Sequence, residues 1–209
     1  MQYIIFDVET TGLYKNDEVI QFSAMVLDEH MRLTRVVNFY SETQVPISPQ
    51  AYNTHRLTKA KLHDLSEQVV FEDNWLTFVE SLRGQQVVWI DWSVGGFDER
   101  LVNQTLTNNG LEDYFHFPRY KNIEQCSRDM LSTFDLMGFI SQKYGRTKMR
   151  LSEAAKALPY SKMQLEYAYD KIVSKFPNID VETKYHNSLY DTFITWLLFK
   201  QHIGALFNE

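Results

Sequence analysis

The chain has 209 residues, of which 44% are hydrophobic and 23% are charged, a balance typical of a globular protein. We expect residues 1–209 to form a single domain. The net charge of −6 argues against a protein that coats nucleic acid through a broad basic surface, but not against an enzyme that handles a strand end. No apolar run approaches the roughly 18 residues that span a membrane, no basic leader precedes Tyr3, and Cys126 is the single cysteine. We therefore expect no membrane partner and a reducing, cytoplasmic location.

The first part of the chain is predicted to be an antiparallel meander of three strands. Apolar and β-branched runs cover residues 3–9, 18–27 and 32–40, and short turns join them. A loop with two prolines at 45–49 precedes a short helix at 51–58. Apolar spacing then predicts a helix at 74–82.

The remainder of the chain is predicted to be mostly helical. A buried fourth strand at 86–90 leads through a glycine-rich loop into a helix at 97–108, and an aromatic segment at 114–122 is predicted to hold a short fifth strand. Helical spacing follows at 124–143, 151–158, 163–175 and 187–206. Strands first and helices later indicate a mixed sheet flanked by helices. Residues 143–184, the most polar helical region, are expected to be a helical insertion or a lid.

Asp7 and Glu9 stand one residue apart where the first apolar strand ends. Side chains two apart on a strand share a face, so the two carboxylates point the same way. Two unpaired negative charges there are costly, and hard oxygen ligands suit a divalent cation such as Mg²⁺ or Mn²⁺. Taken alone, the pair is better explained as ordinary turn residues at a strand end that meets water, so the metal interpretation needs further carboxylates.

Two distant places supply such residues. Asp98 starts the helix behind the fourth strand, and His186 precedes Asp191 at the start of the last helix. Positions five apart on one helix are separated by roughly 140°, so His186 must lie in the turn before the helix, with Asn187 or Ser188 as N-cap. The alternatives are that Ser188 and Asp191 form a capping-box variant and that His186 is an exposed loop histidine.

These motifs closely resemble those of the DEDD superfamily of 3′-to-5′ exonucleases, in the DnaQ-like branch (DEDDh) where a histidine precedes the last aspartate by five positions. They read Phe6-Asp7-Val8-Glu9-Thr10-Thr11-Gly12, then Gly95-Gly96-Phe97-Asp98, then His186 with Asp191. The resemblance runs from residue 3 to about residue 200, although 121–184 matches only as generic helix. It implies an α/β, ribonuclease H-like fold with a mixed five-stranded sheet of meander and parallel strands.

The resemblance also implies a mechanism. Two divalent cations, Mg²⁺ or Mn²⁺, would be held by Asp7, Glu9, Asp98 and Asp191, with Asp7 bridging them. His186 would be the general base, because imidazole titrates near working pH. The expected partner is a single-stranded nucleic acid 3′ end, and the expected product is a nucleoside 5′-monophosphate.

Substrate contacts follow from the same resemblance. Relatives hold the terminal nucleotide with the backbone of the turn, here Thr10, Thr11 and Gly12, and with the next apolar residue, here Leu13. His55 begins a segment, 55–58, that is similar to the family's His-Gly-Ile-Thr, with an arginine in place of the glycine. We therefore count His55 as a further candidate for substrate binding.

Two questions remain open at the level of sequence. Many relatives carry a His-Asn pair ahead of the second motif, where this chain has Trp92 and Ser93, and this departure makes Asp91 a rival of Asp98. The sequence also does not fix the sugar of the substrate, so an oligoribonuclease-like or structured-RNA-trimming enzyme competes with an exonuclease on single-stranded DNA. A non-catalytic nucleic-acid-binding module is the alternative of another class.

Overall fold

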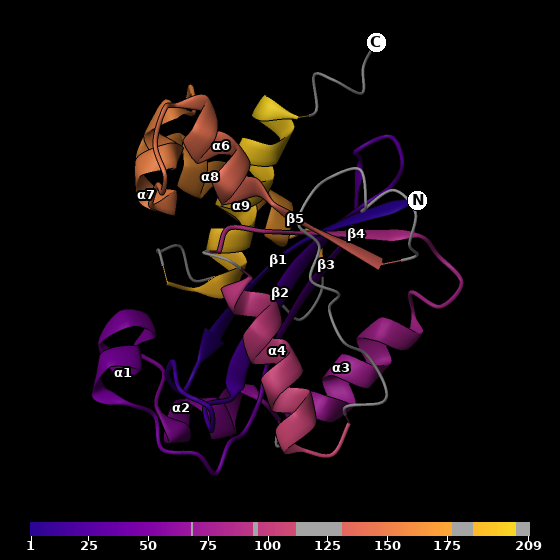
Figure 1. Ribbon diagram of the computed structural model, residues 1–209, viewed down its shortest axis with the longest axis vertical. Coiled ribbons are helices and arrows are strands. Elements are labelled where there is room, and N and C mark those ends of the chain that lie inside the picture. The colour runs from indigo at the N-terminus through magenta and orange to yellow at the C-terminus, as the bar shows by residue number, and fades with distance from the viewer. Residues whose placement is uncertain (68, 94–95, 112–130, 177–185, 204–209) are drawn as a thin grey trace.

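The computed structural model describes residues 1–67, 69–93, 96–111, 131–176 and 186–203 (Figure 1). Its centre is a five-stranded sheet in the order β3-β2-β1-β4-β5. The strands are β1 (Gln2–Thr10), β2 (Val19–Leu27), β3 (Leu33–Tyr40), β4 (Val87–Asp91) and β5 (Leu131–Asp135). The first three pair antiparallel, whereas β4 pairs parallel with both β1 and β5. The predicted mixed five-stranded sheet is confirmed.

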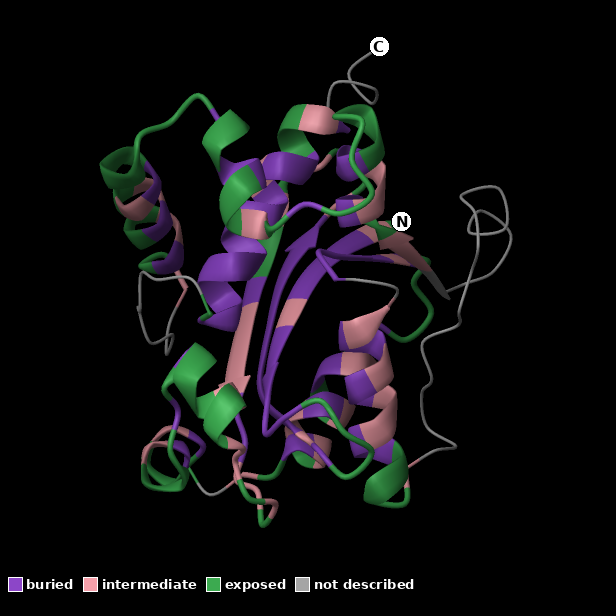
Figure 2. Ribbon diagram, turned by 60° about the vertical axis from the view of Figure 1, so that its left-hand side comes forward, coloured by how far each residue is buried: buried purple, intermediate pink, exposed green. Residues whose placement is uncertain are grey.

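Helices cover both faces of the sheet (Figures 1 and 2). One face packs against α6 (Leu136–Lys143), α7 (Leu151–Ala154), α8 (Lys162–Val173) and α9 (Ser188–His202). The other packs against α3 (Phe71–Glu80) and α4 (Phe97–Asn108). Within the described residues, no helix has both the length and the apolar character needed to cross a membrane.

The alternation of side chains along β1 decides where its carboxylates point. Tyr3 and Ile5 pack in the cluster with α9, whereas Ile4 and Phe6 pack in the cluster with α3 and α4. Because side chains on a strand alternate between faces, Asp7 continues the first series. Glu9 lies two residues further along the same face, so both carboxylates lie on the α9 side of the sheet.

The α3 side of the sheet is a dense aromatic core. Trp75 and Trp89 are fully buried, with ring centroids 5.9 Å apart, and Phe22 lies 5.3 Å from Trp75 in an edge-on arrangement. Phe6 in turn meets Trp89 edge-on at 5.5 Å. Offset and edge-to-face aromatic pairs add to the free energy of apolar burial, so this packing fixes β1 against movement beneath the carboxylates.

Two short helices follow β3. Ser48 caps α1 (Pro49–His55), and its side chain accepts a hydrogen bond from the Ala51 N–H. Thr58 caps α2 (Lys59–Leu65) in the same way. The sequence predicts one helix at 51–58, and the structure corrects this, because the backbone turns left-handed at Arg56 and a second helix begins beyond it.

The prediction for the region before α6 is partly wrong. The fifth strand predicted at 114–122 lies outside the described residues, whereas residues 131–135, predicted to be helical, form β5. Helical spacing is a local signal, and parallel pairing with β4 overrides it here. The helix starts only at Leu136, where the Asp135 side chain caps it by accepting from the Gly138 N–H at 2.7 Å.

The described part of residues 143–184 packs as a layer of the domain. Leu158, Leu165 and Tyr169 are buried in the same hydrophobic cluster as α9. Tyr169 meets Tyr190 of α9 edge-on at 5.2 Å. This region therefore supports the helix that carries Asp191, and a lid that closes over the site stays a prediction.

Candidate active site

The carboxylates of β1 lie where the sheet meets α9. Glu9 is buried and Asp7 is partly buried, and both stand on paired strand positions, opposite Gln21 and Ser23 of β2. A register shift follows Glu9, so the pairing is regular up to the second carboxylate and irregular immediately after it. The paired backbone holds the two acidic side chains in one orientation.

The start of α9 brings the third motif to the same place. Asn187 is the N-cap and its side chain accepts from the backbone N–H groups of Leu189 and Tyr190. His186 lies in the turn before it with φ of 66°, and its backbone N–H donates to Asp191 Oδ2 at 3.0 Å. The predicted turn is confirmed. The capping-box alternative with Ser188 as the cap is wrong, because Asn187 holds that position.

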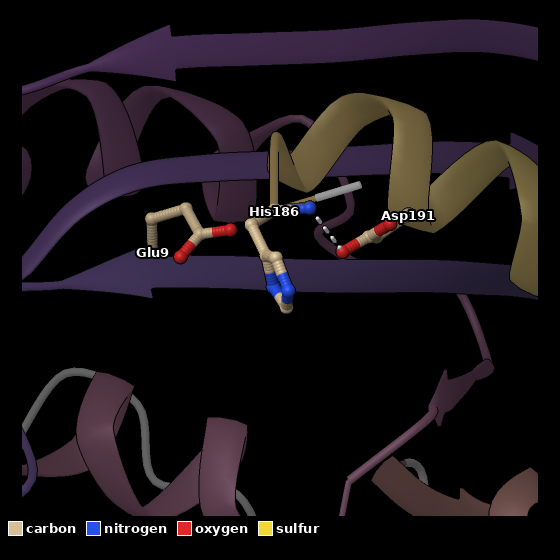
Figure 3. Close-up of side chains that lie close together, drawn as sticks. All are labelled: Glu9, His186 and Asp191. Atoms are coloured by element: carbon tan, nitrogen blue, oxygen red, sulfur yellow. Dashed lines mark hydrogen bonds between the residues drawn. The ribbon is translucent and has the colours of Figure 1, made fainter. Parts of the chain in front are cut away.

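Glu9, His186 and Asp191 form one cluster (Figure 3). Each offers a candidate ligand atom, and these atoms lie within 4.8 Å of one another. The Glu9 carboxylate comes from the strand, and the other two groups come from the turn and first part of α9. His186 is exposed, whereas both carboxylates are buried, so the cluster opens to solvent on the imidazole side. His186 is exposed, as the loop-histidine alternative expects, but a ring nitrogen of His186 also lies within 4.8 Å of the Glu9 and Asp191 carboxylates.

Asp98 reaches the cluster from α4. It is buried in the first turn of that helix, behind the N-cap Gly96, whose φ of 72° suits glycine. Burial raises the pKa of Asp98 well above its usual range, and the negative charges of Asp7, Glu99 and Asp191 raise it further. Asp98 is therefore near enough to carboxylates of β1 and α9 for their charges to act on it.

The same physical causes act on the other members of the cluster. Burial raises the pKa of Asp7 and of Glu9 well above the usual range, and in both cases Asp191 is the strongest of the neighbouring charges that add to it. Burial also raises the pKa of Asp191 to about 7, against the hydrogen bond from His186 that lowers it. Neighbouring carboxylates that are largely removed from water are unfavourable in the charged form unless protons or a cation neutralise them.

The site fits a hard divalent cation on an independent ground. Asp98 Oδ2 and Asp191 Oδ1 are buried, and neither oxygen has a hydrogen-bond partner in the part of the chain that the structure describes. Buried polar atoms are nearly always paired, so two orphaned carboxylate oxygens in one cluster indicate a missing ligand. Oxygen donors of this kind are those preferred by Mg²⁺ and Mn²⁺.

Asp91, the rival of Asp98, is held differently. It ends β4, is buried, and accepts a hydrogen bond from the Ser93 hydroxyl, whose oxygen in turn accepts from the Phe97 N–H at 3.1 Å. Burial raises its pKa, and Glu99 is the strongest of the neighbouring charges that contribute. Asp91 is thus tied into the loop before α4. Asp91 also lies near enough to Asp7 to raise its pKa, so the assignment of Asp98 rather than Asp91 to the site stays a prediction, which the unpartnered Oδ2 of Asp98 favours.

Comparison with known proteins settles the family. The family model described as Exonuclease (RNase_T) matches residues 4–199. The chain belongs to this exonuclease family. A PolC-type DNA polymerase III of Ureaplasma parvum is 28% identical to this chain over 111 residues. The match covers 53% of this chain and 7% of that protein.

Solved structures share the fold of this exonuclease. Exonuclease I of E. coli in complex with a dA16 oligonucleotide aligns with 99% of this chain and 42% of its own, at a TM-score of 0.68 and 16% identity. Its complex with a dT13 oligonucleotide gives a TM-score of 0.67 at 17% identity. The chain thus spans less than half of the length of these relatives. The likeness confirms the predicted ribonuclease H-like fold.

Hydrogen bonds of buried side chains hold the turn after β1. The buried Thr11 hydroxyl donates to Asp17 Oδ1 at 2.9 Å and accepts from the Glu18 N–H. A Cβ on Gly12 would lie 2.6 Å from the Asp17 carboxylate, so this close approach requires glycine. Leu13 is 53% exposed. Asp17 was missed at the level of sequence, because an aspartate in a polar turn gives no signal by itself.

Thr10 and His55 support this turn from behind. The Thr10 hydroxyl donates to the Gly12 carbonyl at 2.8 Å. His55 is buried; its Nδ1 accepts from the Leu57 N–H, so its Nε2 carries the hydrogen and donates to the Thr10 carbonyl at 3.1 Å. Both ring nitrogens of His55 are therefore occupied by the backbone. Trp92, another aromatic beside the second motif, is buried and donates to the Met149 carbonyl, so it is a core residue.

A buried polar network behind α9 was also missed. The hydroxyls of Ser23 and Ser188 lie 2.5 Å apart, and Ser23 Oγ donates to Asn38 Oδ1 at 2.7 Å. Gln21 Nε2 donates to the same Asn38 oxygen at 3.0 Å. The available signal was the presence of Gln21 and Ser23 in the otherwise apolar strand β2. These contacts fix the start of α9 on the sheet, and with it the position of Asp191.

Proposed function

We propose that this protein is a metal-dependent 3′-to-5′ exonuclease that releases nucleoside 5′-monophosphates from single-stranded DNA. The observation that carries the proposal is the cluster of Glu9 from β1 with His186 and Asp191 from α9. The effects of Asp191 on the pKa of Asp7, and of Asp7 on that of Asp98, support adding these two carboxylates to the site. Membership of the exonuclease family supports the reaction class. The single-stranded oligonucleotides held by Exonuclease I support the substrate class.

The four carboxylates would hold two divalent cations, Mg²⁺ or Mn²⁺, with Asp7 between them. Their mutual repulsion and the two orphaned oxygens of Asp98 and Asp191 favour occupancy. When bound, such a pair activates a water molecule near neutral pH and stabilises the charge on the departing 3′ oxygen in an in-line displacement. Because all four protein donors are carboxylates, the set favours hard cations over zinc or copper.

His186 takes the proton of the attacking water in this proposal. Partial burial of the imidazole lowers its pKa, so the ring is neutral and able to accept a proton at pH 7. The left-handed backbone of His186 and the hydrogen bond from its N–H to Asp191 fix the backbone position from which the side chain extends. The residue is exposed, so a substrate can reach the ring from solvent. The same strained turn thus couples the base to a metal-binding carboxylate.

The terminal nucleotide is expected against the turn after β1. Thr10, Thr11 and Gly12 present a backbone that internal hydrogen bonds hold in place, and Leu13 offers an exposed apolar side chain to a base. His55 acts through the turn, since its ring already donates to the Thr10 carbonyl. Action on RNA ends, and a cytoplasmic location, stay predictions.

The deciding experiment is digestion of single-stranded DNA and RNA oligonucleotides of one sequence, labelled at the 5′ end, with Mg²⁺ or Mn²⁺. A ladder that shortens from the 3′ end, lost in chelator and in Asp7→Asn, is the expected result. Asp64→Asn is the matched control, because Asp64 is an exposed aspartate of α2. If the intact protein binds the oligonucleotides and cleaves neither, the binding-module interpretation replaces this one.

A further inference from the structure

Helix α1 ends at an arginine in a conformation that arginine disfavours. Arg56 has φ of 63° and ψ of 15°, and its backbone N–H donates to the Tyr52 carbonyl at 2.8 Å to close the helix. A glycine, which the similar family segment carries here, makes the same bond without the steric cost that a Cβ brings in this region. The fold therefore does not require the arginine side chain.

The side chain of Arg56 is exposed, and none of the described residues supplies a counter-ion for its charge. The guanidinium lies over the ring of Tyr52, 5.5 Å from its centroid, and Nη1 donates to Asn53 Oδ1 at 3.2 Å. Within the described ranges, the ion pairs of the exonuclease involve other residues, and no carboxylate lies within ion-pair distance of Arg56. Tyr52 is itself 40% exposed, so the stacked pair faces solvent.

This exposed cation stands beside the active site. Arg56 directly follows His55, whose ring donates to the carbonyl of Thr10, the residue after Glu9. A second bond, from the Ser48 N–H to the Thr11 carbonyl at 2.8 Å, ties the start of α1 to the same turn. Figure 1 shows α1 at the end of the sheet where α4 and α9 begin. A positive charge is thus placed at the rim of a carboxylate cluster, in a chain of net charge −6.

We propose that Arg56, stacked on Tyr52, binds the phosphodiester backbone of the substrate strand upstream of the bond that is cleaved. A guanidinium presents paired N–H donors that match phosphate oxygens, and the aromatic ring beneath it fixes its plane. In the proposed reaction the carboxylates would hold the cations that bind the scissile phosphate, so the guanidinium of Arg56 is available for a neighbouring phosphate. The contact keeps the shortened strand bound when the nucleoside monophosphate leaves. This inference rests on the proposed exonuclease function.

The test compares two substrates that differ in upstream phosphates. One is a 5′-labelled single-stranded oligonucleotide, and the other is the p-nitrophenyl ester of thymidine 5′-monophosphate, which has none. Arg56→Gly is expected to raise KM for the oligonucleotide roughly 10-fold, as loss of a charged hydrogen bond does. It should lower kcat/KM for the oligonucleotide far more than for the ester. The slope of log affinity against log salt should become shallower by about 0.7, the value for one phosphate contact on a single strand.

Two further variants distinguish loss of the phosphate contact of Arg56 from a folding defect. Arg56→Lys retains the charge and should keep the wild-type salt slope with an intermediate KM. Arg83→Ala removes an exposed arginine that lies just before β4, at the opposite end of the sheet, and should leave both substrates unaffected. The Tm of Arg56→Gly should equal or exceed that of the wild type, because glycine relieves the backbone.

The outcomes separate the inference from the function beneath it. An unchanged oligonucleotide KM and salt slope in Arg56→Gly, with the ester still hydrolysed by the wild type, overturns the phosphate contact alone. Equal losses on both substrates together with a lower Tm also overturn it, since they assign Arg56 to the stability of α1. If the wild type hydrolyses neither substrate with either cation, the exonuclease proposal itself fails.

Discussion

Asp91 and Asp98 are both buried aspartates at the two ends of the loop between β4 and α4, and they differ in what satisfies them. Asp91 accepts a hydrogen bond from Ser93, which also accepts from the first N–H of α4. Asp98 leaves Oδ2 without a partner among the described residues, and its pKa responds to Asp7 and Asp191 across the site. We therefore expect Asp91, which the protein itself satisfies, to be structural, and Asp98, which has an unpartnered oxygen, to bind a cation.

The largest expected effect tests this contrast directly. Asp98→Asn should reduce exonuclease activity by more than the roughly 10- to 100-fold that loss of an outer partner of a metal ligand causes. Asp91→Asn, which keeps an acceptor for Ser93, should stay below the roughly 10-fold lower end of that range. Single-turnover rates on a 5′-labelled oligonucleotide measure both.

A thermal melt in chelator supplies the control for Asp98→Asn. Its Tm should equal or exceed that of the wild type, because the substitution removes one of several buried like charges. The contrast is wrong if Asp91→Asn loses more activity than Asp98→Asn while both variants remain folded.

The second expected effect is a loss of stability at higher pH, which an added divalent cation restores. The pKa values of the cluster carboxylates are raised in the folded state, that of Asp191 to about 7, so the folded chain holds protons that the unfolded chain has released. Without metal, the contribution of these carboxylates to the free energy of unfolding should therefore be largest below about pH 4. It should be lost as the pH rises through about 7. Tm measured in chelator should fall from pH 5 to pH 8.

Added Mn²⁺ or Mg²⁺ should restore the loss, and more so at higher pH, where the carboxylates are free of protons. At a concentration 100 times the dissociation constant the gain is about 2.7 kcal/mol, or roughly 5–11 °C for a chain of this size. In Asp98→Asn the gain should shrink, whereas in Asp91→Asn it should persist. A metal-induced rise in Tm that is independent of pH contradicts the raised pKa values.

The smallest effect concerns the partner of Asp91. Ser93→Ala removes the hydroxyl that donates to the buried Asp91 carboxylate, and leaving a buried acceptor unpaired costs about 1–3 kcal/mol. The Tm should fall while the rate per folded molecule changes less than in Asp98→Asn. Ser93→Thr, which retains a hydroxyl, should recover most of the Tm. Ser174→Ala, at an exposed serine, serves as the matched control. No loss of Tm in Ser93→Ala would remove the structural role given to Asp91.

Most of the site geometry was predictable because it rests on short-range rules. Alternation along β1 places Asp7 and Glu9 on one face, and the turn before α9 is required by the spacing of His186 and Asp191. Both follow from residues close in sequence. The resemblance favours Asp98 over Asp91, because Asp98 follows Phe97 at a helix start, but the hydrogen bond from Ser93 to Asp91 is visible only in the folded loop.

The rest depended on tertiary contacts that local patterns do not carry. β5 forms at residues 131–135 because β4 offers a parallel partner, against a helical pattern in the sequence. The support of the turn by Asp17 and His55, and of α9 by Ser23, involves partners that the chain brings together only when folded. Such residues look ordinary in the sequence, because their role is defined by what they touch.

The position of β1 in the centre of the sheet has a consequence for folding. β1 pairs with β2, which follows it closely in the chain, whereas β4 follows only after α3. His186 and Asp191 lie far from β1 in the chain, at the start of α9. Contacts between residues so far apart in sequence form slowly. The proposed site therefore stays without His186 and Asp191 until α9 docks on the sheet, so we expect it to be completed late in folding.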